Sequence, residues 1–144
     1  MGEKIAFKLL QGVEITPLKQ IFHEKGNVFH AMKASEKSFF EFGEAYFSSI
    51  NYGDIKGWKK HTKMKMNIIV PVGSVKFYFY NEDVGKSNNV LVNSQNYCRL
   101  TVEPGVWMAF EGITKEMNLL LNIASIEHDP DEAINVPLTT FELR

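Results

Sequence analysis

Apolar and polar residues alternate in two stretches that meet at a Pro-Val-Gly turn near the middle of the chain. The residues of one parity are apolar: Met64, Met66, Ile68 and Val70 in the first stretch, and Val75, Phe77 and Phe79 in the second. A two-residue period is typical of strands that bury one face. The pattern therefore predicts a pair of half-buried β-strands at 64–70 and 75–80, around which the remaining sheet is built.

Shorter apolar segments, separated by Gly, Pro and Asn, fill most of the remaining sequence. They predict strands at 5–7, 13–15, 28–33, 39–50, 90–92, 98–102, 106–110 and 117–124. The polar residues 81–89 are expected to form a flexible surface loop, and residues 129–133 one short helical turn. Many short strands with almost no helical period favour one antiparallel sandwich or barrel domain over residues 1–144.

The composition, 44% hydrophobic and 23% charged, is that of a globular protein. No apolar run is long enough to span a bilayer and the first residues lack a signal-peptide pattern, so we expect a soluble, cytoplasmic protein without a membrane partner. A net charge of -1 gives no general attraction to nucleic acid. Cys98 is the single cysteine, which excludes an internal disulfide and suggests a small buried side chain.

A basic cluster precedes the first alternating stretch. Its lysines are Lys56, Lys59, Lys60, Lys63 and Lys65, and it also holds Trp58 and His61. An imidazole titrates near neutral pH, so His61 could be a general base, or it could be a structural or ligand-contacting residue at a strand start. Lys59 could act as a base if it were buried, contact a phosphate, or simply be solvated. The cluster suits a diphosphate, although alternate lysines on a strand can also form its solvated face.

Polar and aromatic side chains elsewhere supply further candidates. Glu44, Tyr46 and Ser48 share one parity of a predicted strand, so they could line a cavity and bind hydroxyl groups or base edges, or form cross-strand pairs. Trp58 and Trp107 could stack on a base or a sugar ring, or fill the core.

Five short segments occur in a characteristic order and spacing. They are Glu24–Phe29 (EKGNVF), Phe42–Ser48 (FGEAYFS), Lys56–His61 (KGWKKH), Val72–Val75 (VGSV) and Glu103–Phe110 (EPGVWMAF). Together they resemble the dTDP-4-dehydrorhamnose 3,5-epimerase family over nearly the whole chain. The resemblance implies an all-β fold, a cupin-type double-stranded β-helix or jelly-roll barrel, with a nucleotide-sugar pocket inside the barrel and a homodimeric assembly.

The chain departs from this family at the residues that perform its chemistry. Aligned on the family's Arg-Gly-Leu-His segment, Lys56 takes the place of the arginine and Lys59 that of the catalytic histidine. Met108 lies near the second family histidine, and Asn122 corresponds to the tyrosine that acts as an acid. The motifs Gly-Trp-Lys-x-His, Pro-Gly-Val-Trp and Leu-Leu-Asn-Ile-Ala followed by His-Asp-Pro resemble a divergent branch of epimerase-related cupins. Retained 3,5-epimerase activity is therefore not implied.

The predicted function is epimerisation or isomerisation of a nucleotide-linked 4-keto hexose, in the biosynthesis of cell-surface polysaccharide sugars. His61 is assigned as the base, and Lys59 as a contact to the enolate or the diphosphate. Substrate binding is assigned to Lys25, Glu44, Tyr46, Lys56, Trp58, Trp107, Asn122 and His128. The loss of the family acid favours epimerisation at one centre, or ketoisomerisation, over a double inversion.

Two further points complete the sequence-based hypothesis. His128 could orient the site from a loop, or could lie on the surface beside an acidic turn. The segment Gly57–His61 offers one imidazole where a cupin metal site needs several histidines and a carboxylate, so we expect no metal and no cofactor. The alternative function is a non-catalytic nucleotide-sugar-binding or accessory cupin.

Overall fold

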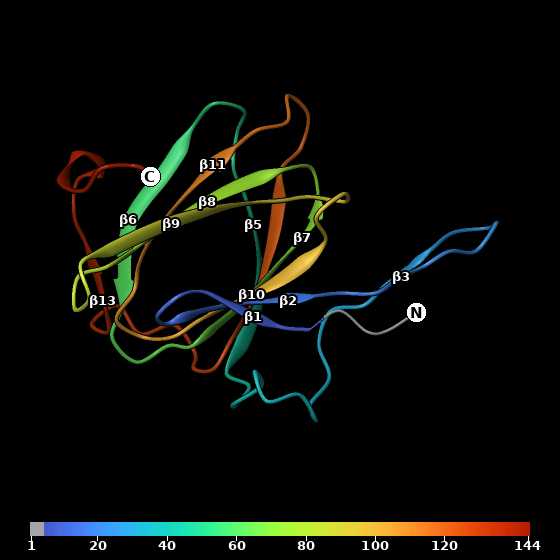
Figure 1. Cartoon of the computed structure of the whole chain (residues 1–144), viewed down its shortest axis with the longest axis horizontal. Helices are drawn as coiled ribbons and strands as arrows, with labels where there is room; N and C mark the ends of the chain where they lie inside the picture. The colour runs from blue at the N-terminus through green and yellow to red at the C-terminus, as the bar shows by residue number, and fades with distance from the viewer. Residues whose placement is uncertain (1–4) are drawn as a thin grey trace.

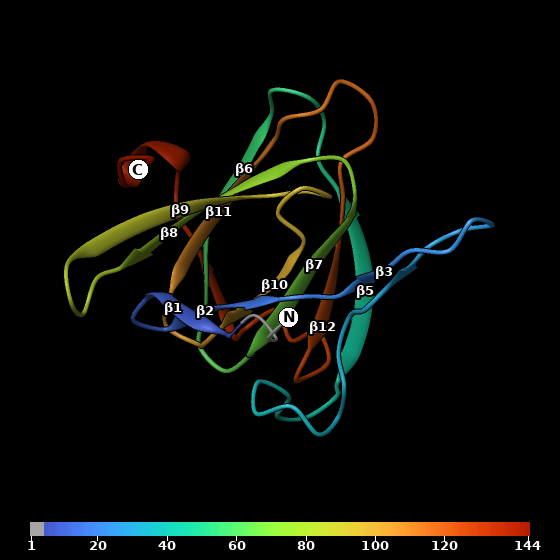
Figure 2. The ribbon, with the colours of Figure 1, turned by 45° about the vertical axis from the view of Figure 1, so that its right-hand side comes forward.

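Two antiparallel sheets face each other in the computed structural model, which describes residues 5–144 (Figures 1 and 2). The six-stranded sheet has the order β1 (Phe7–Leu10), β2 (Val13–Pro17), β10 (Cys98–Val102), β7 (Met66–Val72), β12 (Leu119–Ala124) and β5 (Glu44–Ser49). The five-stranded sheet has the order β13 (Ala133–Asn135), β6 (Ile55–His61), β11 (Trp107–Gly112), β8 (Val75–Asn81) and β9 (Lys86–Val92). This architecture confirms the predicted all-β jelly-roll barrel of the cupin type.

Smaller elements complete the chain. The hairpin of β3 (Gln20–Ile21) and β4 (Val28–Phe29) projects from the barrel as an arm in both views (Figures 1 and 2). A 3-10 helix, η1 (Leu138–Thr140), lies near the C-terminus. Within residues 5–144, no helix is long and apolar enough to cross a membrane. Residues 1–4, which the single-domain prediction includes, lie outside the described residues.

The core lies between the sheets, and the alternating apolar residues of the two central stretches are part of it. Ile68 of β7 is 1% exposed, and Phe77 and Phe79 of β8 are fully buried. Full burial of one such side chain contributes about 1.5–3 kcal/mol to stability. Cys98 is also buried, which raises the pKa of its thiol to about 11 and makes it a poor nucleophile.

The two central strands do not pair with each other, which corrects the expected strand pair. Strand β7 lies between β10 and β12, whereas β8 lies between β11 and β9. The turn at Gly73 and Ser74 therefore carries the chain from one sheet to the other. Alternation identified the buried face of each strand, but it does not identify the strand's neighbours.

Two other segments differ from expectation. The predicted polar loop 81–89 is shorter than expected: residues 82–85 form the turn, and residues 86–89 belong to β9, an edge strand whose Asn88 Nδ2 donates to the Leu9 carbonyl at 3.0 Å. Its polar sequence is accounted for because one side of an edge strand faces solvent. Residues 129–132 form a single turn, in which the Glu132 N–H donates to the Asp129 carbonyl at 3.2 Å, but no helix; the turn leads into β13, which pairs with β6 so that Ala133 lies opposite His61.

The loop between β4 and β5 covers part of the outer face of the six-stranded sheet. Arg99 of β10 is fully buried under it and donates to the Ala31 carbonyl at 2.6 Å, Glu36 Oε2 at 2.6 Å and Ser38 Oγ at 2.7 Å. Burial alone would raise the pKa of Glu36, but the Arg99 hydrogen bond and charge outweigh it, so this pKa lies below its usual range.

Candidate functional site

A cavity of about 340 Å³ lies inside the barrel between the two sheets. Its polar lining consists of Tyr46, Ser48, Lys56, Lys59, His61, Asn122 and Asn135, and its apolar lining of Met66, Ile68, Met108, Phe110 and Leu120. Gly57 completes the wall. Polar groups thus converge over an apolar floor, as they do in sites for small organic ligands.

Strand β6 supplies the titratable groups because its alternation points every second side chain inward. Gly57, Lys59 and His61 line the cavity, whereas Trp58 and Lys60 lie on the other face. Lys56, near the start of the strand, also contributes to the lining. Gly57 has a φ of +150°, and a Cβ there would lie 2.4 Å from Ala109 Cβ on β11. Glycine is therefore required for the close approach of β6 to β11.

His61 is buried and is held by the buried carboxylate of Glu132. The ring nitrogen Nδ1 hydrogen-bonds Glu132 Oε1, while Oε2 accepts the backbone N–H groups of Thr62, Lys63 and Met64 at 3.1–3.2 Å. A carboxylate at Nδ1 requires the proton on that nitrogen. Nε2, which makes no hydrogen bond to the described residues, is then the proton acceptor of a neutral ring in the cavity.

The charge of Glu132 is maintained by its hydrogen bonds. Burial raises the pKa of its carboxyl group. The His61 contact and the N–H groups of Lys63 and Met64 together lower this pKa by more than burial raises it, so the net pKa lies below its usual range. Glu132 therefore remains a carboxylate near neutral pH and fixes the orientation of the imidazole.

Positive charge lies beside this dyad. Lys59 is an exposed residue whose side chain lines the cavity, and Asn135 of β13 lies opposite it in the strand register. The Lys56 ammonium donates to the Ser49 carbonyl at 2.8 Å and lies 5.9 Å from the centre of the Phe110 ring. The two lysines make this wall suitable for an anionic ligand.

The opposite wall carries Asn122 and Tyr46, which face each other across β12 and β5. Asn122 is fully buried, and its Nδ2 donates to the Tyr46 hydroxyl at 3.0 Å. Its Oδ1 is buried and has no hydrogen-bond partner among the described residues. Because a buried, unpaired acceptor costs about 1–3 kcal/mol, this oxygen is suited to receive a hydrogen bond from a ligand.

The two tryptophans do not line the cavity, which corrects their expected role. Trp58 is 1% exposed on the outer side of β6, and its Nε1 donates to the Leu138 carbonyl at 3.0 Å. Trp107 lies on the same side, where its Nε1 donates to Glu82 Oε1 at 3.2 Å. Both alternate with residues that do line the cavity, so the strand period turns them outward.

Three more predicted residues lie outside the cavity lining. Glu44 shares the parity of Tyr46 but lies at the start of β5, beyond the lining residues. His128 is exposed in the loop before β13. Lys25 lies in the turn of the β3–β4 arm, which projects away from the barrel (Figure 1).

Sequence reasoning missed Glu132 and Asn135. Glu132 is 71 residues away from His61 along the chain, and its segment was interpreted as a helical turn. No local pattern connects the two residues, because their contact depends on the pairing of β13 with β6. Strand β13 has only three residues, which is too short for an alternating pattern to be recognised in the sequence.

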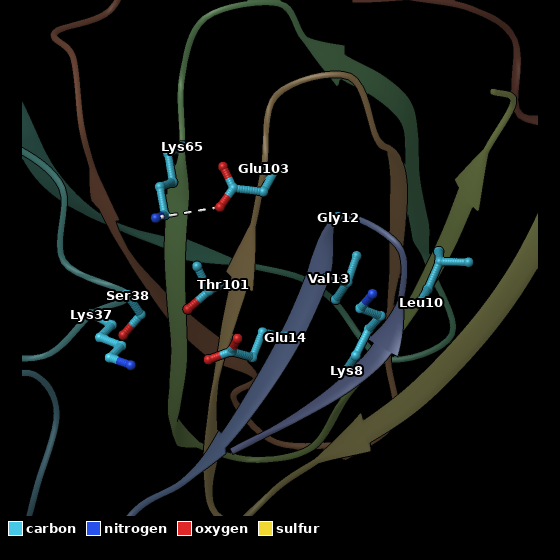
Figure 3. A pocket seen from close by; sticks show the side chains of 10 residues that line it. All are labelled: Lys8, Leu10, Gly12, Val13, Glu14, Lys37, Ser38, Lys65, Thr101 and Glu103. Atoms are coloured by element: carbon cyan, nitrogen blue, oxygen red, sulfur yellow. Dashed lines mark ion pairs between the residues drawn. The ribbon is translucent and has the colours of Figure 1, made fainter. Parts of the chain in front are cut away.

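A second hollow, of about 230 Å³, lies by the β1–β2 hairpin (Figure 3). Lys65 and Glu103 form an ion pair at 3.3 Å there, and Lys8 lies opposite Glu14 in the strand register. Its charges are mixed and it contains no imidazole. We therefore place the candidate active site in the His61 cavity.

Residues 11–140 match the family model described as FdtA: WxcM-like, C-terminal. Comparison with curated protein sequences gives no significant match. Among solved structures, a dTDP sugar isomerase from Desulfovibrio desulfuricans G20 is 28% identical, with a TM-score of 0.87 over 95% of this chain and 90% of that one.

More distant structures share the fold. QdtA, a sugar 3,4-ketoisomerase from Thermoanaerobacterium thermosaccharolyticum solved with TDP, is 22% identical, with a TM-score of 0.75 over 87% of this chain and 88% of that one. The RmlC epimerase of Mycobacterium tuberculosis is 15% identical, with a TM-score of 0.84 over 94% of this chain and 74% of that one. At these identities the likeness supports the fold alone.

Proposed function

Because the chain belongs to the FdtA family (WxcM-like, C-terminal), we propose that it epimerises or isomerises a 4-keto hexose linked to a nucleoside diphosphate. The observation that carries this proposal is the buried His61–Glu132 pair, whose free imidazole nitrogen belongs to a cavity lined by lysines. We further propose that the product serves the biosynthesis of cell-surface polysaccharide sugars.

His61 is the base in this mechanism. Its Nε2 removes the proton from the carbon next to the carbonyl, and Glu132 stabilises the imidazolium that forms. The Lys59 ammonium stabilises the negative charge that develops on the carbonyl oxygen. Proton return to the opposite face of the same carbon inverts that centre. Where that carbon carries a hydroxyl group, the ketone moves by one position instead: the former carbonyl oxygen takes up a proton, the neighbouring hydroxyl gives one up, and the proton removed by His61 is delivered to the former carbonyl carbon.

The second wall contributes a hydroxyl group. Tyr46 and Asn122 lie on the six-stranded sheet, opposite His61 on the five-stranded sheet. Their hydroxyl and amide groups bind the sugar hydroxyls in this proposal, while Lys56 contacts the diphosphate. The apolar floor, with Met66 and Met108, accommodates carbon atoms that carry no hydroxyl.

Deuterium uptake tests this function. A 4-keto sugar nucleotide incubated with the protein in heavy water is expected to gain deuterium, measured by mass spectrometry, and His61→Ala is expected to abolish the uptake. A panel of dTDP-, UDP-, GDP- and CDP-sugars in a thermal-shift assay identifies the nucleotide, because a ligand of the folded state raises the melting temperature.

The second candidate function is a non-catalytic nucleotide-sugar-binding or accessory cupin. It is favoured by Lys59, which occupies the position aligned with the catalytic histidine of the dTDP-4-dehydrorhamnose 3,5-epimerase family. A wild-type protein that binds a sugar nucleotide tightly and exchanges no proton with any member of the panel would establish this alternative and remove the enzyme.

We also propose a homodimer. Large apolar side chains are exposed on the arm and on and near β5: Phe22 at 79%, Phe29 at 52%, Phe40 at 65%, Phe42 at 63% and Phe47 at 64%. We assign these exposed rings to the dimer interface, because exposed apolar patches mark protein interaction sites. Substrate binding by Lys25, Glu44 and His128 stays a prediction, as do the cytoplasmic location and the expectation of no metal, cofactor or nucleic acid.

A further inference from the structure

The last part of the chain forms a strap along β6. We define the C-terminal strap as residues 132–143. It follows β6 through the β13 pairing and through the hydrogen bond from Thr62 N to the Glu132 carbonyl at 2.8 Å. It continues with reciprocal backbone bonds between Trp58 and Val136 at 3.1 and 3.3 Å. The strap thus spans β6 from the base, His61, to Trp58.

Two residues of the candidate site are carried by this strap. Glu132 holds the His61 ring, and Asn135 lines the cavity opposite Lys59. Within residues 5–144, β13 is the sheet neighbour of β6 on the side away from β11. The position of the strap therefore sets the position of both side chains.

The end of the strap is fixed by an aromatic plug on the outer face of the five-stranded sheet. The Phe141 ring lies 4.6 Å from that of Tyr80, 5.3 Å from that of Trp107 and 5.6 Å from that of Trp58, measured between ring centres. The Leu138 carbonyl accepts the Trp58 indole N–H at 3.0 Å. These contacts lie on the side of β6 that faces away from the cavity.

We propose that Phe141 is a positioning residue that acts on His61 through the strap. Its ring fixes the strap on Trp58, and the strap holds Glu132 against His61 Nδ1. Phe141 lines no part of the cavity, so it affects the orientation of the base without touching a ligand. Its effect on turnover rests on the proposed function, whereas its effect on the His61 ring does not.

The variant Phe141→Ala tests this role in the 144-residue chain. We expect the proton-exchange rate to fall by about tenfold to a hundredfold, because small displacements of a catalytic group have effects of that size. We expect affinity for the sugar nucleotide to change less than about threefold. Phe141→Leu keeps an apolar plug and is expected to restore most of the rate. Phe7→Ala, which removes an exposed ring on β1, is the matched control.

The histidine ring gives a readout that is independent of turnover. In nitrogen-15 NMR spectra, with the His61 signals identified by His61→Ala, the wild type is expected to show the proton on Nδ1. Phe141→Ala is expected to give a mixture of the two tautomers. A folded Phe141→Ala with unchanged His61 signals would overturn the positioning role. If that variant does not fold, Phe141→Val, a smaller truncation of the same ring, takes its place, and unchanged His61 signals with a wild-type exchange rate in Phe141→Val would overturn the role. Altered signals in a protein that never exchanges protons would overturn the proposed function and leave the positioning role intact.

Discussion

At the scale of single residues, the carboxylate of Glu132 decides whether His61 can act as a base. Glu132→Gln keeps the size of the side chain but removes the charge that stabilises an imidazolium and selects the tautomer. We expect proton exchange to fall by about 10²-fold or more, by analogy with the orienting aspartate of serine proteases. Stopped-flow or mass-spectrometric exchange rates measure the effect. Glu82→Gln, at an exposed ion pair with Lys60, should retain the wild-type rate.

Glu132 also makes a pH-dependent contribution to stability. Its pKa is lowered in the folded chain, so its stabilising effect is complete above the ordinary glutamate value of about 4.3 and is lost as the pH falls through the lower folded-state value. The difference in unfolding free energy between wild type and Glu132→Gln should therefore shrink as the pH falls below about 4.3. Urea unfolding at several pH values measures it, and a difference that grows on acidification would contradict this assignment.

Asn122 is predicted to bind the sugar part of the ligand rather than its nucleotide part. Asn122→Leu removes the buried, unpaired Oδ1 and should weaken binding of the sugar nucleotide by roughly tenfold. Binding of the nucleoside diphosphate alone should be unchanged. Isothermal titration with both ligands separates the two cases, and an equal loss for both would place Asn122 outside the sugar site.

At the scale of elements, the turn between β7 and β8 depends on Gly73. Its φ is +80°, and a Cβ there would lie 2.3 Å from the Met117 carbonyl oxygen. Gly53 offers a matched control, since its φ is +78° but no atom lies within 4 Å of the added Cβ. Gly53→Ala should cost about 1–2 kcal/mol through φ alone, and Gly73→Ala about 2 kcal/mol more. Denaturant midpoints measure both, and equal losses would show that the carbonyl contact has no effect.

The elements also show what the sequence could determine. Alternation at Ile68, Phe77 and Phe79 identified buried strand faces correctly, because side-chain direction follows from local geometry. The same signal could not show that β7 and β8 belong to different sheets. The basic cluster grouped Trp58 with His61 by proximity in sequence, although the two side chains lie on opposite faces of β6.

At the scale of the whole molecule, the motif order predicted more than single residues did. The family match over residues 11–140 and the dTDP-sugar isomerases and epimerases among the structural neighbours confirm the resemblance to epimerase-related cupins. Contacts between residues that are far apart along the chain could not be predicted from the sequence. Glu132 was missed because its contact with His61 forms only through the complete sheet.

The proposed dimer can be tested on the six-stranded sheet. Phe47→Glu introduces a charge on an exposed apolar position of β5 and should give a monomer by light scattering, because burying an unpaired charge in an interface is unfavourable. Leu91→Glu, a similarly exposed apolar position on β9, is the control and should remain dimeric. A monomeric wild type at micromolar concentration would remove the dimer itself.

The order of β6 and β13 along the chain has a consequence for how the molecule is made. Synthesis proceeds from the N-terminus, so a growing polypeptide contains His61 and all strands of the six-stranded sheet before Glu132 has been added. Such a nascent chain contains every lining residue of the cavity except Asn135, yet its imidazole has no carboxylate to orient it. The base is therefore completed only after the segment that carries Glu132 has been added, and a chain truncated before that segment would contain His61 without the carboxylate that positions it as a proton acceptor.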